Sequence, residues 1–138
     1  MSSVIFLQYF ENQKSAGIPR DAVRKAFGSS LQEPESDYWS LPYDAGNACT
    51  IFLEPFDADT VHQLTVERSC EDARLWDYLL AVLALGNAIM YSPRSSTPVI
   101  VDEGAIQHIP CALLGALGIP VVVRNAQEIR AVFVPSIA

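Results

Sequence analysis

The sequence predicts a mixed α/β fold: a single mixed β-sheet with a central buried helix and a C-terminal βαβ unit. Three observations predict it. Half of the residues are apolar and 18% are charged, which is typical of a packed globule. Strand-like segments are interspersed with helix-like segments, separated by Pro, Gly and Asn. The last third of the chain also places a strand, a helix and a strand in succession. Because no repeat or long linker divides the chain, we expect one domain, residues 1–138.

The N-terminal half is predicted to form strands around one short helix. Residues 4–10 are rich in β-branched and aromatic side chains, which favours a strand. A short amphipathic helix follows Pro19 and ends at Gly28. Further strands are predicted at residues 37–41, 49–54 and 61–68, the last two as an antiparallel pair. In the second of these, Leu64 and Val66 alternate with polar residues, so one face should be buried and one wet.

The C-terminal half is predicted to contain the central helix and a parallel crossover. Residues 69–86 form the helix, with Ser69 as its cap, and its second half is apolar on every side. A strand at 97–101, a helix at 110–117 and a strand at 121–123 then have the spacing of a βαβ unit. The alternating segment 129–134 is predicted to be a last strand.

Negative charge is concentrated in the middle of the chain. Residues 33–77 contain eleven acids and two bases and carry −9, whereas the whole chain carries −7. Such a field repels nucleic acid and anionic membrane surfaces and attracts a basic partner. The alternative is that the acids simply keep the protein soluble.

Aromatic residues are interleaved with these acids. Tyr and Trp are enriched at interface hot spots, and surrounding acids would steer a basic protein toward them. The alternative is that the aromatics cover the helices from the sheet, since strand alternation must send some of them inward. The predicted partner-binding residues are Asp37, Tyr38, Trp39, Tyr43, Asp44, Glu54, Phe56, Asp57 and Asp59.

In size, acidity and organisation the chain resembles the small bacterial immunity proteins that neutralise polymorphic or contact-dependent toxins. The features that carry the resemblance are the aromatic stretch at 37–43, the strand pair, and the segment from Glu67 through Trp76 into a long buried helix. The resemblance implies stoichiometric, non-catalytic inhibition of a toxin by a tight complex. The expected partner is therefore a basic protein, with no cofactor.

A small enzyme or ligand-binding domain is the alternative function, and an adaptor subunit is a third. His108 and Cys111 lie close together at a predicted helix start, where the helix dipole can activate a thiol. Burial of Cys111 as a small hydrophobe explains the same residues, and we expect it to be structural and unreactive. Asp102 and Glu103 follow a predicted parallel strand, but a capped helix start is the favoured interpretation.

Several other classes of function lack support in the sequence. The three cysteines and two histidines form no metal-binding spacing, and no phosphate-binding glycine motif or basic patch is present. The longest apolar run is too short to cross a bilayer, and the start of the chain does not have the pattern of a secretory signal. An odd number of unpaired cysteines fits a reducing compartment, so a cytoplasmic location is expected.

Overall fold

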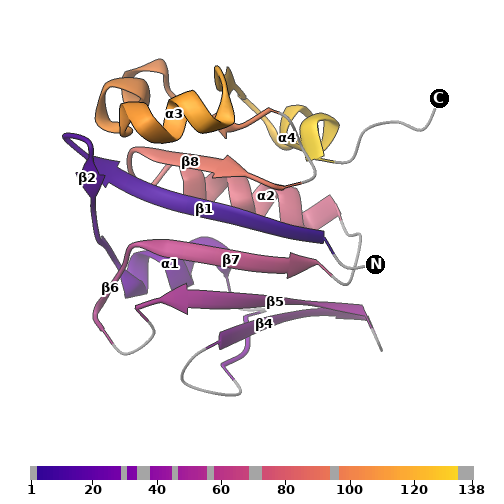
Figure 1. The fold of residues 1–138 in the computed structure, drawn as a ribbon. Helices are drawn as coiled ribbons and strands as arrows, with labels where there is room; N and C mark the ends of the chain where they lie inside the picture. The colour runs from indigo at the N-terminus through magenta and orange to yellow at the C-terminus, as the bar shows by residue number, and fades with distance from the viewer. Residues whose placement is uncertain are drawn as a thin grey trace.

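The computed structural model describes residues 3–28, 31–33, 38–44, 47–55, 58–68, 73–93 and 97–133. It confirms the α/β fold, with a mixed sheet and helices packed on it (Figure 1). The strands are β1 (Ser3–Glu11), β2 (Lys14–Ser15), β3 (Ile18–Pro19), β4 (Tyr38–Asp44), β5 (Asn47–Glu54), β6 (Thr60–Val61), β7 (Gln63–Arg68), β8 (Ala88–Tyr91), β9 (Val99–Ile100) and β10 (Val121–Val122). The helices are α1 (Arg20–Phe27), α2 (Ala73–Leu83), α3 (Cys111–Leu117) and α4 (Ala126–Phe133), with a 3₁₀ helix at Glu103–His108.

The main sheet is built around β1. Its strand order is β10-β9-β8-β1-β7-β5-β4, β2 forms a hairpin with β1, and β3 and β6 make a separate small ladder. Strand β1 pairs antiparallel with β7 and β8, and β5 pairs antiparallel with β7, as predicted for that pair. Alternate residues of β1 point into the core, where Ile5, Leu7 and Tyr9 are buried.

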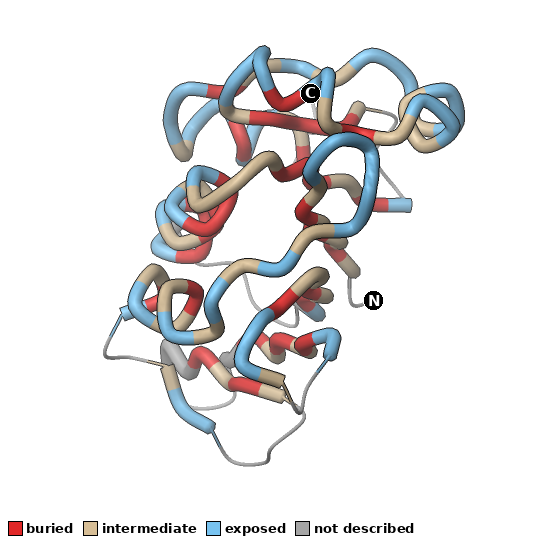
Figure 2. The backbone as a smooth tube through the Cα atoms, turned by 90° about the vertical axis from the view of Figure 1, so that its left-hand side faces the viewer, coloured by how far each residue is buried: buried red, intermediate tan, exposed pale blue. Residues whose placement is uncertain are grey.

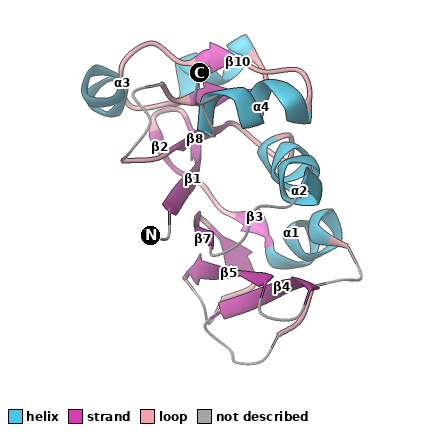
Figure 3. Cartoon of the chain, turned by 90° about the vertical axis from the view of Figure 1, so that its right-hand side faces the viewer, coloured by secondary structure: helices cyan, strands magenta, loops and turns pink. Residues whose placement is uncertain are grey.

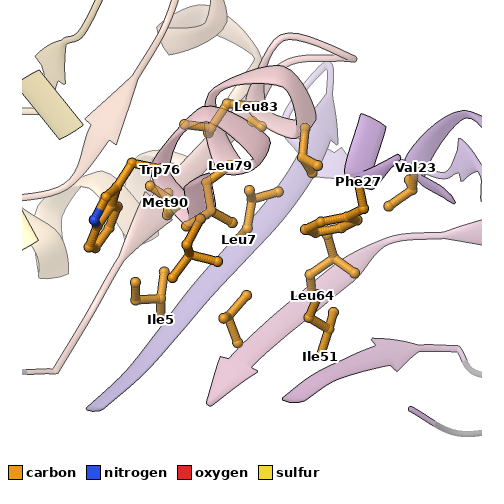
Figure 4. Packing of buried hydrophobic residues seen from close by; sticks show 14 of the residues in the cluster. Ile5, Leu7, Val23, Phe27, Ile51, Leu64, Trp76, Leu79, Leu83 and Met90 are labelled. Carbon is orange, nitrogen blue, oxygen red and sulfur yellow. The ribbon is translucent and has the colours of Figure 1, made fainter. Parts of the chain in front are cut away.

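Helices α1, α2 and α4 cover one face of this sheet, and α3 lies on the other side (Figure 3). Helix α2 lies between α1 and α4, and its residues Leu75, Leu79 and Leu83 are buried. Figure 4 shows Leu79 and Leu83 among the buried side chains of β1 and β7, Leu7 and Leu64. The predicted central helix is thus found, flanked by α1 and α4 and buried on the side that faces the sheet. Its outer side is exposed, at Asp77 and Ala81, and Figure 2 shows buried and exposed stretches alternating around the helices.

The predicted C-terminal βαβ unit is confirmed, because β10 pairs parallel with β9 and α3 lies between them in the chain. The 3₁₀ helix and α3 cover the β8–β10 end of the opposite face, around a second small core that includes Ile89, Ile100 and Ile109. The Asp102 side chain accepts a hydrogen bond from the Gly104 N–H at 2.9 Å, so this acidic segment is a capped helix start.

Two parts of the secondary structure differ from the prediction. The segment predicted as a last strand belongs to α4, which buries Ile129 and Phe133 on one side. Its start is fixed by reciprocal bonds: Asn125 accepts from the Glu128 N–H at 2.9 Å, and Glu128 accepts from the Arg124 N–H at 2.7 Å. Strand β8 was not predicted, because it is short and directly follows the turn after α2. The predicted cap Ser69 lies outside the described residues.

Candidate functional site

A row of side chains crosses five strands, β8, β1, β7, β5 and β4, on the face of the sheet opposite α1 and α2. The pairing register places Tyr91 beside Phe6, Phe6 beside Thr65, Thr65 beside Phe52, and Phe52 beside Tyr38. Two aromatic pairs lie at the ends of the row. The ring centroids are 5.5 Å apart for Phe6 and Tyr91 and 6.0 Å apart for Tyr38 and Phe52. We call these five residues the aromatic row.

Polar residues occupy the positions on either side of the aromatic row. Toward the β1–β2 hairpin, Gln8 and Gln63 face each other, and the Gln8 amide donates to the Gln63 amide oxygen at 2.9 Å. Glu54 continues this register on β5 and is exposed. On the other side, Glu67 and Thr50 are paired. An apolar stripe is therefore bordered by polar positions that include two carboxylates.

The aromatic row is not part of either hydrophobic core of the described residues. Its members are half-buried, whereas their immediate neighbours Leu7, Leu53 and Leu64 are buried on the helical side. In the view of Figure 1, no helix lies in front of β1, β7 or β5. Partial burial raises the pKa of Tyr91, because desolvation disfavours the phenolate. The row is thus a partly desolvated, open surface.

Trp39 is not on this surface, and its prediction as a partner-binding residue is wrong. Its exposed fraction is 0%, because it lies on the core side of β4, between Tyr38 and Ser40. Phe27 packs edge-on at a centroid distance of 6.3 Å. The guanidinium groups of Arg20 and Arg24 lie 5.3 Å and 5.8 Å from the ring centroid. Helix α1 therefore covers the indole.

The other predicted partner-binding residues have different outcomes. Tyr38 belongs to the aromatic row, and Glu54 lies on the same face. Asp59 is exposed, and its carbonyl accepts from the Arg20 N–H at the start of α1. Tyr43 and Asp44 are in β4, but their side chains are not described. The remaining three predicted residues, Asp37, Phe56 and Asp57, lie outside the described residues.

The acids of the central segment do not all gather on one face. Glu54 and Glu67 lie on the open face of the sheet. Asp77 is exposed on α2, on the opposite side, and Glu33 pairs with Arg24 of α1 at 2.9 Å. Of the predicted partner-binding residues whose side chains are described, Tyr38 and Glu54 lie on the open face.

Cys111 is exposed at the start of α3, so the expectation that it is buried among apolar residues is wrong. Its sulfur lies 4.0 Å from the Gln13 amide oxygen. His108 contacts the β1–β2 turn instead, where its Nδ1 accepts from the Asn12 N–H at 3.1 Å and its carbonyl accepts from the Gln13 N–H at 2.8 Å. The described contacts of both residues are therefore made to this turn.

His62 has a local structural partner. Its Nδ1 and the Ser15 hydroxyl are 2.9 Å apart, and its backbone N–H donates to the Glu54 carbonyl at 2.8 Å.

Over the described part of the chain, no three potential ligands among His, Cys, Asp and Glu converge into a metal-binding group. Within the same residues, no helix is long and apolar enough to span a bilayer.

A cavity of about 430 Å³ opens beside the aromatic row, at the end of the sheet near the β1–β2 hairpin. Its lining residues include Gln8, Phe10, Ser15, Glu54, His62 and Gln63. Sequence reasoning identified neither this cavity nor Phe6, Thr65 and Tyr91 in the row. The alternation of Phe6 and Gln8 with buried residues in β1 was the available signal.

In comparisons with known proteins, no protein-family model, curated protein or solved structure matches this chain.

Proposed function

We propose that this protein is a non-catalytic inhibitor that forms a tight complex with a basic protein, as an immunity protein does with its cognate toxin. We also propose that it acts in the cytoplasm. The observation that carries the proposal is the aromatic row, a half-buried stripe on a sheet face that no described helix covers at β1, β7 and β5. Exposed contiguous apolar stripes with polar borders are typical of protein-interaction sites. Tyr and Phe supply large contact areas there at little entropic cost.

Charge supports a basic partner for this surface. The chain has a net charge of −7, and Glu54 and Glu67 border the aromatic row directly. Complementary charge mainly accelerates encounter, whereas the desolvated aromatics slow dissociation. Cytoplasmic action is supported by the sequence, whose three cysteines are an odd number without a CxxC pair, as is typical of a reducing compartment.

The two carboxylates on opposite sides of the molecule provide a matched test. Glu67 is exposed beside the aromatic row, and Asp77 is exposed on α2. Each variant is purified and mixed with the candidate partner, a basic toxin domain encoded by a neighbouring gene, and association is measured by stopped flow at low salt. We expect Glu67→Lys to lower the association rate constant by about three- to tenfold. Asp77→Lys, with the same change in net charge, should have a smaller effect.

Binding of a protein partner that is equally impaired by the two reversals would contradict the proposed surface. Absence of any protein partner, with a metabolite bound instead, would contradict the proposed class of function.

A further inference from the structure

We propose that the cavity beside the aromatic row is an anchor pocket for the guanidinium group of an arginine of the partner. This inference rests on the proposed function, because it specifies which side chain of a basic partner the open face receives. The cavity, of about 430 Å³, falls within the size range of sites that enclose a single chemical group or small ligand.

The pocket is continuous with the aromatic row. Gln8, Gln63 and Glu54 form the next register on the same face, each two residues from a member of the row. Two residues along a strand span roughly 7 Å. A partner segment that packs on Phe6 and Phe52 therefore reaches the pocket with one long side chain.

The charge of the pocket favours a cation. Among the described residues that line it, Glu54 is the one acid, and no lysine or arginine is present. The nearest base along the chain, Lys14, lies opposite Glu11 in the β1–β2 register and does not line the cavity. An incoming cation thus meets an exposed carboxylate with no described lysine or arginine in the wall.

The hydrogen-bond acceptors in the wall of the pocket suit a guanidinium group, whose N–H donors lie in one plane. The Gln63 amide oxygen accepts from the Gln8 amide N–H at 2.9 Å, which orients the two amides relative to each other. The register places Gln63 between Gln8 and Glu54, so the Gln8 amide oxygen and the Glu54 carboxylate are acceptors on either side of it in the wall. Guanidinium presents several donors in one plane and binds carboxylate in a bidentate manner, which ammonium cannot do.

The wall of the pocket formed by His62 is held in place from two sides. The Ser15 hydroxyl lies 2.9 Å from its Nδ1. On its other side, a Cβ added at Gly17 would lie 3.0 Å from the His62 Nε2 and 2.9 Å from the Thr60 Cβ. The imidazole therefore has little room to close the cavity, and the pocket exists before a partner binds.

The test uses the full chain and two probes, N-acetyl-arginine methylamide and its neutral isostere N-acetyl-citrulline methylamide. Side-chain amide signals of Gln8 and Gln63 are followed by ¹⁵N NMR during each titration. We expect saturable shifts of both signals with the arginine probe and none with the citrulline probe. Glu54→Gln should weaken binding by about tenfold or more, since a charge-assisted hydrogen bond is lost. The matched control Asp77→Asn, which removes the same charge on the opposite side of the molecule, should change it less than about twofold.

Equal binding of the two probes, no saturable shift with the arginine probe, or equal losses in the two variants would overturn the inference. The outcome is separable from that of the proposed function, because the probes need no protein partner. Probe binding without a protein complex on the aromatic row would refute the proposed function. A row-dependent complex without probe binding would refute the pocket alone.

Discussion

The two faces of the sheet are formed by the same strands but differ in how far their side chains are buried. On one face, Leu7 and Leu64 pack beneath α2 and are fully buried. On the other, their chain neighbours Phe6 and Thr65 remain half-buried in the aromatic row. Both faces carry large apolar side chains, so hydrophobicity does not distinguish them. The difference lies in the covering elements. Among the described residues, three helices pack on one face, and the other is covered by the 3₁₀ helix and α3 near β8–β10.

Adjacent residues of β4 give the sharpest test of this contrast. Trp39→Ala should lower the free energy of unfolding by about 3–5 kcal/mol, because it empties a fully buried site beneath α1. Tyr38→Ala, on the open face, should cost less than about 1.5 kcal/mol. Urea denaturation of both variants measures the difference. Similar costs at the two positions would mean that the open face is covered in solution.

The sequence predicted the fold better than it predicted the surface. Strand alternation correctly assigned Leu64 and Val66 to the core, and the Pro and Gly positions bounded α1 and α3 well. The same alternation could not say which face of β4 would be covered, so Trp39 was placed outside.

The last helix was missed for a related reason. Ile129 and Phe133 fit both an alternating strand and a helical stripe, and the deciding signal was the cap formed by Asn125 and Glu128. The aromatic row unites β1, β4, β5, β7 and β8. No local pattern predicts such pairings between distant segments.

A second prediction concerns the hydroxyl of Tyr9, which lies in the core on the helical side of the sheet. The Tyr9 hydroxyl donates to the Val82 carbonyl at 2.7 Å, and Tyr9→Phe removes this buried hydrogen bond, leaving the carbonyl only the Leu85 N–H at 3.2 Å. We expect the free energy of unfolding at pH 7 to fall by about 1–2 kcal/mol. The control Tyr38→Phe, on the open face, should change the free energy of unfolding by less than about 0.5 kcal/mol.

The same variant has an expected pH dependence. Burial raises the pKa of Tyr9 above the ordinary value, which is about 10. The native chain therefore keeps this phenol neutral, and its contribution to stability is complete below pH 10 and lost as pH rises above it. Because phenylalanine cannot ionise, the difference between the native protein and Tyr9→Phe should shrink by about 1.4 kcal/mol between pH 7 and pH 11. A constant difference would contradict the assigned burial.

The smallest effect is expected within the aromatic row itself. Phe6 and Tyr91 are tilted rings 5.5 Å apart, and a double-mutant cycle with alanine should give a coupling energy of about 0.5–1.5 kcal/mol. The stacked pair Trp76 and Phe133 on the helical side, 6.2 Å apart, is the comparison. Zero coupling for Phe6 and Tyr91 alone would show that the row is not ordered before binding.

Hydroxyl-radical footprinting of the complex tests the central claim most directly. Phe6, Tyr38, Phe52 and Tyr91 on the open face should lose reactivity when the cognate toxic domain is added. Tyr78, half-buried on the helical side, should keep its reactivity and serves as the internal control. Protection of Tyr78 with unchanged reactivity of the four open-face aromatics would contradict the account.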